Sequence, residues 1–473
     1  MISPETDPKI PYVPQQIILF GHPQRIDALL ETSQAAQSGP QEQGDTPPPA
    51  PPVLLSRSTF AVSSATAAET EMLANLPDPE LRELRLYRTD TPQALQNQPG
   101  FEDVIVELNY LIRGIPWTAG GSPWTAGGSP WTAGGSPWTA GGSPWLNQAG
   151  TGGASIRQQA ETAFAEQWAW GADGINAQDL LTPRQPGAED GENVWVGIFD
   201  TSPFAVPMTS ISVDMPPAPL TLALSHPIPG GVPHGCGGGL GNHGFFVAGL
   251  IHALAPAAQL QLIRVLDDAA QGTLFTLVTA LYQFMAALPA GQRAVINMSL
   301  GLHGSDEADA ADWDGPDLLR DALWRAYEQN IITIAAAGNE SSAESAPLPA
   351  AYPARWDFVI GVAASNRQQS RACFSNQGDL LAPGGDGDHR CLPNLGRCKD
   401  GDCPYALISL DVASYTGYSY GVGTSFAAPL VAGLAARAQA GVGAQNASAG
   451  AEHVRQIILN SANANGVVDA QAL

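Results

Sequence analysis

The stretch AVINMSLGLHGSDEADAADWDGPDLLRDALWRAYEQNIITIAAAGN, residues 294–339, holds two largely apolar runs on either side of an amphipathic segment. The runs AVINMSL and IITIAAAG do not alternate between apolar and polar residues, which is typical of strands covered on both faces of a parallel sheet. Between them, Leu319, Leu323 and Tyr327 recur every four residues, and this spacing predicts a helix over residues 317–329 with one apolar face. The stretch therefore predicts a strand–helix–strand unit with parallel strands.

The same alternation continues on both sides of this unit, from about residue 160 to the C-terminus. Further apolar runs are VWVGIFD (194–200), LQLIRVLD (260–267) and FVIGVAAS (358–365), with helical patterns after residue 243, near 274–287 and from residue 424. Several such units in one chain build a sheet with helices on both faces. We expect an α/β fold with a doubly wound, mostly parallel sheet.

A smaller module precedes this region. Apolar runs at residues 15–20, 81–88 and 104–112 predict strands, and residues 25–33 and 92–98 predict helices. This pattern suits a small α+β domain over residues 1–113, interrupted by a Pro-rich segment at residues 37–52.

A repeat at residues 114–153 separates the module from the α/β region, which spans residues 154–473. The heptad PWTAGGS starts at Pro116 and occurs four times in a row, and Gly and Pro at this density oppose a helix. We interpret the repeat as an expandable linker. A row of Trp side chains that binds sugars or a partner is the alternative.

The charge of the chain excludes some classes of protein. Its 473 residues include 21 Lys and Arg against 45 Asp and Glu, a formal charge of −24, which argues against partners such as nucleic acids and anionic membrane surfaces. No run of about 18 apolar residues could span a membrane, and the first residues lack the basic and apolar regions of a signal peptide. We expect a soluble protein and leave its compartment open.

Four polar side chains stand where apolar runs end or helices begin. Asp200 ends VWVGIFD, His243 opens a helix, Asn339 ends IITIAAAGN, and Ser425 opens the helix of GTSFAAPLVAG. Ligands of parallel sheets collect at the carboxyl ends of the strands. Taken together, an Asp, a His and a Ser with an amide between the last two form the set needed for nucleophilic catalysis.

These residues lie in motifs that resemble those of subtilases, the subtilisin-like serine peptidases of peptidase family S8. The motifs are DTS (200–202), NHGFFVAGLI (242–251), NMSLG (297–301), AAAGNE (335–340) and GTSFAAPLVAG (423–433). The resemblance covers about residues 163–473 and implies a subtilisin-like catalytic domain that acts as a serine endopeptidase on a peptide or protein substrate.

The resemblance also implies a role for each residue. Ser425 would be the nucleophile, His243 the general base and then acid, and Asp200 the carboxylate that orients the imidazole. The Asn339 amide and the Ser425 N–H would bind the oxyanion. No cofactor is required for this chemistry; structural calcium is an open alternative, with acidic stretches at residues 305–314 and 384–389.

The same resemblance places the S1 pocket for the residue before the cleaved bond. We expect its walls at Ser299, Leu300, Gly301, Ala336, Ala337, Gly338 and Ala351. Because these walls carry no charge, we expect a preference for apolar or aromatic residues.

The N-terminal module resembles a subtilase propeptide. This implies an intramolecular inhibitor and folding chaperone that the enzyme removes by self-processing, so that the chain is a zymogen. A merely attached domain is the alternative.

Several features leave other interpretations open. Ser202 and Pro203 follow the Asp-Thr pair where the family usually has Gly, and Phe245 and Phe246 replace its usual Thr and His, so a catalytically silent peptide-binding protein is one alternative. A precursor-specific processing peptidase or transpeptidase is another. GYSYG around Ser419 fits the G-x-S-x-G pattern but lacks the acid and His that would have to follow in order.

The cysteine-rich insertion is also ambiguous. Cys391, Cys398 and Cys403, with His389 nearby, could form a disulfide, hold zinc or remain thiols.

Overall fold

The computed structural model describes residues 12–37, 50–62, 70–71, 73–90, 95–96, 99–114, 156–182, 185–228, 240–302, 313–387, 405–412, 417–445 and 450–473. The described part of the chain forms two compact units. The first contains Met1–Leu111, Thr273–Ala287 and His303–Arg325, and the second contains Ile112–Gly272, Leu288–Leu302 and Ala326–Leu473. Two segments of the expected α/β region therefore belong with the N-terminal module.

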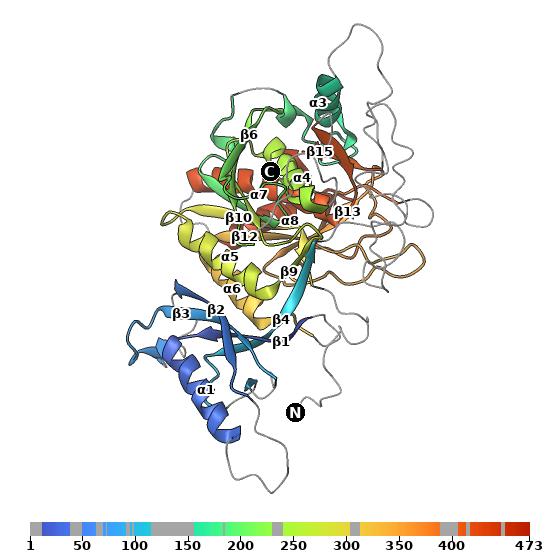
Figure 1. Cartoon of the computed structure of the whole chain (residues 1–473). Helices are drawn as coiled ribbons and strands as arrows, with labels where there is room; N and C mark the ends of the chain where they lie inside the picture. The colour runs from blue at the N-terminus through green and yellow to red at the C-terminus, as the bar shows by residue number, and fades with distance from the viewer. Residues whose placement is uncertain are drawn as a thin grey trace. The chain divides into compact units, whose positions relative to one another are not determined.

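The second unit is built on an eight-stranded sheet in the order β14-β13-β12-β10-β5-β8-β7-β6. Figure 1 labels β6, β10, β12 and β13 of this sheet. Its strands are β5 (Val194–Asp200), β6 (Ser210–Val213), β7 (Leu220–Ser225), β8 (Gln259–Arg264), β10 (Arg293–Met298), β12 (Ile331–Ala336), β13 (Ile360–Ser365) and β14 (Leu380–Pro383). All neighbouring pairs are parallel except β6 with β7. This confirms the predicted α/β fold with a mostly parallel sheet.

The strand–helix–strand unit of residues 294–339 has the predicted elements. Helix α6 (Asp317–Glu328) separates β10 from β12, and these two strands pair in parallel with Ala294 opposite Ile331. Leu319 and Leu323 are fully buried, as expected for the apolar face of the helix.

The helices of the second unit include α7, which begins at the predicted position. The unit contains α3 (Ile156–Glu166), α4 (His243–Leu254), α7 (Thr424–Gln445) and α8 (Ala451–Asn460). Helix α7, red in Figure 1, contacts β10, β12, β13 and α4. Gly433 permits the approach to α4, because a Cβ at this position would lie 2.8 Å from the Cβ of Leu254.

Shorter elements complete the second unit and its edge. They are β9 (Gln271–Thr273), β11 (Leu300–Gly301), β15 (Leu407–Leu410), β16 (Tyr418–Gly421) and the 3₁₀ turns Trp168–Trp170, Gln178–Leu181, Ala188–Asp190, Leu240–Asn242 and Ala470–Ala472.

The first unit has the expected α+β character. Its strands β1 (Tyr12–Gly21), β2 (Val53–Ala61), β3 (Leu81–Arg88) and β4 (Ile105–Gly114, which ends in the second unit) pair antiparallel in the order β4-β1-β3-β2. Helix α1 (Pro23–Gln37) covers a core that includes Ile17, Leu19, Ile26 and Leu29. Helix α5 (Leu274–Ala287) also belongs to this unit.

Some predictions for the N-terminal half are incomplete or lie outside the described residues. Strand β2 was not predicted, because Val53, Leu54 and Leu55 are 43–48% exposed and do not form a buried apolar run. The predicted helix at 92–98 is described only at residues 95–96, and the Pro-rich segment and the repeat fall almost entirely outside the described ranges.

None of the helices in the described ranges combines the length and the apolar character needed to cross a bilayer.

Candidate active site

Asp200 and His243 meet at the carboxyl end of the sheet. Asp200 is the last residue of β5, and His243 is the first residue of α4. The Nδ1 atom of His243 lies 2.8 Å from Oδ1 and 2.9 Å from Oδ2 of Asp200, and both side chains are fully buried. Because a carboxylate only accepts hydrogen bonds, Nδ1 carries the proton in this pair and Nε2 is left as the basic nitrogen.

The backbone after β5 secures this pair. The Thr201 N–H donates to Asp200 Oδ1 over 2.6 Å, and the Gly244 N–H donates to Thr201 Oγ1 over 3.2 Å. A Cβ at Gly244 would lie 2.2 Å from the Thr201 carbonyl oxygen. Only glycine therefore lets α4 begin so close to the end of β5.

Ser425 lies in the first turn of α7 and is fully buried. The ring of the next residue, Phe426, has its centroid 5.1 Å from that of His243 and 4.5 Å from that of Phe246. The Ser299 Oγ donates a hydrogen bond of 2.8 Å to the Ser425 carbonyl oxygen. The start of α7 is thus held against the start of α4, which brings the predicted nucleophile and base into one region.

Asn339 is hydrogen-bonded to Thr424, the residue that precedes Ser425. Its Oδ1 accepts hydrogen bonds from the Thr424 N–H (2.9 Å) and the Thr424 Oγ1 (3.0 Å). The Gly338 N–H in turn donates to Thr424 Oγ1 over 3.1 Å, and Gly338 adopts a φ of +112° that favours glycine. With its oxygen held in this way, the amide of Asn339 directs its Nδ2 donor away from Thr424.

The residues that depart from the family pattern are packing residues. Phe245 meets Phe204 edge to face with centroids 5.1 Å apart, and Phe246 packs on Phe426. Both are buried in the core of the second unit. The Ser202 Oγ accepts a hydrogen bond of 3.3 Å from the Phe204 N–H. None of these side chains displaces a proton-transfer group.

The expected S1 walls lie in or next to two strands. Leu300 and Gly301 form β11 and Ser299 precedes it, and all three are buried. Ala336 ends β12, Ala337 and Gly338 follow it, and the Ala351 N–H donates to the Ala337 carbonyl over 2.8 Å. All seven predicted side chains are neutral, and those with described burial are buried.

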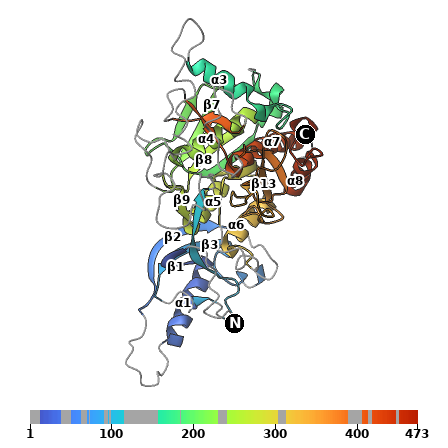
Figure 2. The ribbon, with the colours of Figure 1, turned by 90° about the vertical axis from the view of Figure 1, so that its right-hand side faces the viewer.

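The strand predicted at residues 104–112 extends to Gly114 and runs along this edge, and its pairing there was not predicted from the sequence. The last residues of β4 pair antiparallel with β11, with Gly114 opposite Leu300 and Arg113 opposite Gly301. On its other side, the Gly114 N–H donates to the Ala270 carbonyl over 2.9 Å. Strand β9, which begins after Ala270, pairs with β4, the cyan strand in Figures 1 and 2. The end of β4 therefore lies between two backbone partners.

Ser419, which the sequence analysis considered, and His252, which it did not, lie elsewhere in the second unit. Ser419 lies inside β16 rather than on a strand-to-helix turn, which confirms its exclusion. His252 on α4 bonds to the Ala218 carbonyl over 2.8 Å, and burial lowers its pKa to about 4.

The cysteine and calcium hypotheses lie largely outside the described residues. Cys391, Cys398, Cys403 and His389 are all outside them, whereas Cys373, which the sequence analysis did not single out, is disulfide-bonded. Among the described side chains, no three His, Cys, Asp or Glu gather in a way that could hold a metal ion.

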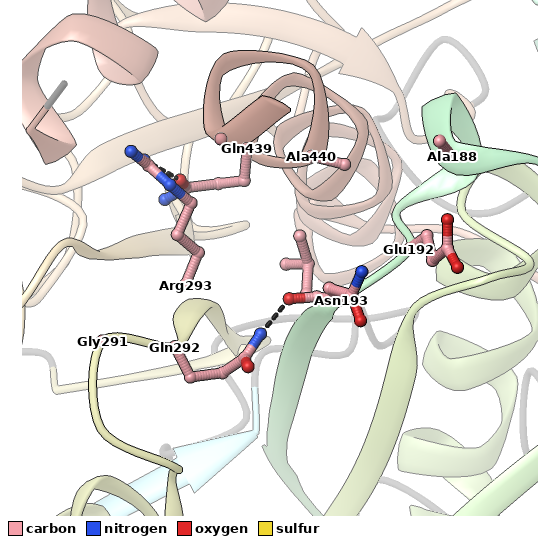
Figure 3. Close-up of a pocket in the computed structure, with 10 residues that line it drawn as sticks. Ala188, Glu192, Asn193, Gly291, Gln292, Arg293, Gln439 and Ala440 are labelled. Carbon is pink, nitrogen blue, oxygen red and sulfur yellow. Dashed lines mark hydrogen bonds between the residues drawn. The ribbon is translucent and has the colours of Figure 1, made fainter. Parts of the chain in front are cut away.

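A pocket of about 350 Å³ lies at the opposite end of the sheet (Figure 3). It is lined by Asn193, which precedes β5, by Arg293 at the start of β10, and by Gln439 on α7. The Arg293 guanidinium donates to Gln439 Oε1 over 2.9 Å. Because Asp200 ends β5, this pocket is not part of the candidate site.

Comparison with known proteins matches a region that contains most of the candidate site residues. The model of the subtilase family, peptidase S8, matches residues 237–472, which include His243, Asn339 and Ser425 and begin after Asp200. The chain is 32% identical over 155 residues to the minor extracellular protease Epr of Bacillus subtilis (strain 168), covering 30% of this chain and 21% of that protein. It is 34% identical over 156 residues to subtilisin DY of Bacillus licheniformis, covering 30% of this chain and 51% of that protein.

The chain thus spans about a fifth to a half of the length of these curated relatives. Among solved structures, the crystal structure of a lanthipeptide protease aligns with 67% of this chain and 95% of that chain, at 20% identity and a TM-score of 0.47.

Proposed function

This chain belongs to the subtilase family, and we propose that it is a serine endopeptidase whose triad is Ser425, His243 and Asp200. The observation that carries the proposal is the buried contact of His243 Nδ1 with both oxygens of Asp200, next to the helix start that holds Ser425. A buried carboxylate in this position keeps the imidazole in the tautomer that can accept a proton at Nε2.

The reaction follows from these positions. His243 Nε2 takes the proton of the Ser425 hydroxyl while Oγ attacks the carbonyl carbon of the substrate, and the resulting oxyanion is bound by the Asn339 amide and the Ser425 N–H. The C–N bond breaks as His243 returns the proton to the leaving amine. Water, deprotonated by His243, then hydrolyses the acyl-enzyme and restores Ser425. No cofactor is needed, because His243 removes and returns each proton.

Labelling with a fluorophosphonate tests the nucleophile. The wild-type chain should react covalently and Ser425→Ala should not, because only a serine activated by a neighbouring base attacks the reagent. Ser419→Ala is the matched control and should label like the wild type. Labelling that persists in Ser425→Ala would sink the assignment, and peptide binding without any labelling would indicate a catalytically silent protein.

We further propose that the N-terminal module is an intramolecular inhibitor. In support, the end of β4 pairs with β11 and β9 as an extended substrate strand would. Since β4 runs antiparallel to β11, the C-terminal end of β4 at Gly114 points toward Ser299, whose Oγ is hydrogen-bonded to the Ser425 carbonyl. A covalent tether gives such an inhibitor an effective concentration on the order of millimolar.

The proposed substrate preference rests on the neutral walls near Ala337 and Ala351. We expect cleavage after apolar or aromatic residues, because an unpaired charge in a buried neutral pocket is costly. A peptide library analysed by mass spectrometry measures this preference. Dominant cleavage after Lys or Glu would contradict it.

A further inference from the structure

Arg264 is a buried cation beside the candidate site. It is the last residue of β8 and lies opposite Asp200 in the parallel pairing with β5. Its side chain is only 2% exposed, and it is the one basic residue within the largely apolar run LQLIRVLD. Burying a guanidinium is costly unless its donors are satisfied, so its partners indicate why it is there.

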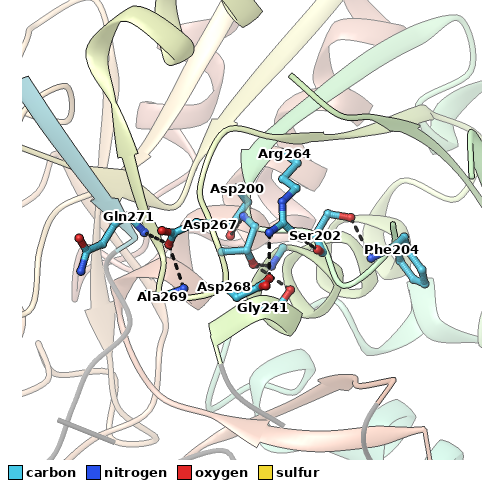
Figure 4. Close-up of polar contacts among 11 residues, drawn as sticks. Asp200, Ser202, Phe204, Gly241, Arg264, Asp267, Asp268, Ala269 and Gln271 are labelled. Carbon is cyan, nitrogen blue, oxygen red and sulfur yellow. Dashed lines mark hydrogen bonds and ion pairs between the residues drawn. The ribbon is translucent and has the colours of Figure 1, made fainter. Parts of the chain in front are cut away.

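The two partners of Arg264 belong to different parts of the site (Figure 4). Its Nη1 donates to the carbonyl oxygen of Ser202, two residues after Asp200. Its Nη2 donates to Asp268 Oδ1 over 2.9 Å, and the Asp268 side chain is 49% exposed. A planar guanidinium presents its donors on separate nitrogens in a fixed fork, whereas an ammonium carries three rotatable donors on a single nitrogen.

Asp268 belongs to a closed loop over residues 267–271. Asp267 Oδ1 accepts from the N–H groups of Ala269 and Gln271, each over 2.9 Å, and the Ala270 N–H donates to the Asp267 carbonyl over 2.9 Å. Figure 4 shows these contacts beside the Arg264 network. Ala270 has a φ of +56°, and its carbonyl oxygen accepts from the Gly114 N–H over 2.9 Å.

We propose that Arg264 is a positioning residue that joins the turn after Asp200 to the loop that receives the backbone of an extended substrate. It touches neither the substrate nor the reacting atoms. Its bond to Ser202 holds the chain that carries Asp200, and its bond to Asp268 holds the loop that presents the Ala270 carbonyl. This inference rests on the proposed peptidase function.

Variants at Arg264 and Asp268, each assayed with two substrates, distinguish the effects of the two contacts. The first substrate is a tetrapeptide amide long enough to reach the Ala270 carbonyl, and the second is an N-acetyl amino-acid ester with the same residue before the cleaved bond, which does not reach it. The hydrolysis of both substrates is measured with protein that was purified as the full chain and then incubated. Fluorophosphonate titration gives the number of active sites.

Asp268→Asn should affect only the long substrate. We expect KM for the tetrapeptide to rise by about two- to fivefold, the size of one partly exposed ion pair, with kcat and the ester kinetics unchanged. Asp173→Asn is the matched control, because Asp173 forms an exposed ion pair of 3.1 Å with Arg367 elsewhere in the same unit. It should change neither substrate.

Arg264→Lys should lower kcat for both substrates by about 10- to 100-fold, because the single nitrogen of lysine does not reproduce the two-nitrogen fork and the charge-assisted hydrogen bond to the turn after Asp200 is weakened. Adding Asp268→Asn to Arg264→Lys should raise the tetrapeptide KM by less than it does alone, since the two residues form one contact. Thermal unfolding shows whether each variant is folded.

The outcomes separate this inference from the proposed function. Unchanged kinetics in folded Arg264→Lys, or equal effects of Asp268→Asn on both substrates, would overturn the role of Arg264. If Arg264→Lys does not fold, the selective effect of Asp268→Asn on the long substrate decides the question. A wild-type chain that fluorophosphonate does not label would overturn the proposed function, and this inference with it.

Discussion

The side-chain amide of Asn339 is oriented by its contacts with Thr424. Its Oδ1 is bound by two groups of Thr424, the residue directly before Ser425. The donors that this amide can offer to the reaction are the N–H groups of Nδ2. The contacts also tie the position of this donor to that of the nucleophile, since Thr424 and Ser425 share the start of one helix.

Asn339→Ala should lower kcat by about 100- to 1,000-fold with little change in KM, the loss known for one oxyanion donor in subtilisin, because the donor acts on charge that develops in the transition state. Steady-state kinetics on a peptide substrate measures it. Asn339→Asp keeps the acceptor for Thr424 but lacks the N–H donors, so it should lose activity as well. A kcat within about threefold of the wild type in either variant would contradict the role of this amide.

At the scale of elements, strand β4 meets the starts of two helices in the first unit. Asn109 Oδ1 accepts from the Phe275 N–H of α5 over 3.0 Å, and Glu107 Oε2 accepts from the Leu318 N–H of α6 over 3.4 Å. Tyr282 of α5 stacks on Phe20 and Phe60 with centroids 5.3 and 4.9 Å apart. The antiparallel sheet and these helices are therefore one packed body.

Glu107 makes this packing sensitive to pH. The pKa of its carboxyl is raised to about 8, chiefly by burial and next by the charge of Asp317, while hydrogen bonds from the helix N–H groups and Tyr110 act in the opposite direction. In the unfolded chain the pKa returns to about 4.5. Between these values the folded form binds more protons, so stability falls as pH rises, with a slope of up to about 1.4 kcal/mol per pH unit.

Glu107→Gln should flatten this slope, because the amide does not titrate. Thermal unfolding of the uncut Ser425→Ala chain, measured from pH 5 to pH 9 with and without Glu107→Gln, reports the difference. Glu80→Gln removes an exposed carboxyl of the same unit and is the control. An unchanged slope in Glu107→Gln would show that this carboxyl is not the group responsible.

At the scale of the whole molecule, the N-terminal module and the candidate site are parts of one chain, and the final residues of β4 lie within the second unit. If the N-terminal module acts as the proposed intramolecular inhibitor, the protein should cut itself. Incubation of the purified wild type should yield fragments cut within residues 111–160, and Ser425→Ala should yield none.

Mass spectrometry identifies the positions of the cuts, and dilution shows whether the cut is intramolecular. An intramolecular cut keeps its half-time when the protein is diluted tenfold, because the tether sets the local concentration. A wild-type chain that labels with fluorophosphonate yet stays intact would contradict self-processing. Ligated fragments instead of hydrolysed ones would point to transpeptidation.

Local sequence patterns were sufficient for the elements that carry the site. Asp200, His243, Asn339 and Ser425 were candidates because each ends or follows a buried strand or opens a helix, positions that are visible within about ten residues of sequence. The parallel sheet followed from its continuous apolar runs in the same way. The roles of the four residues were predicted from the resemblance of the surrounding motifs to those of subtilases. Arg264 could have been noticed as a charge inside the run LQLIRVLD.

Contacts between distant segments of the chain could be found only in the tertiary structure. The pairing of Gly114 with Leu300, its hydrogen bond to Ala270, and the bridge from Arg264 to Ser202 and Asp268 join segments that are far apart in sequence or lie on different strands. The same holds for β2, whose exposed residues form a strand by pairing with β3. Hydrogen bonds depend on distances of about 3 Å between atoms, and the path of the whole chain, rather than any local pattern, sets those distances.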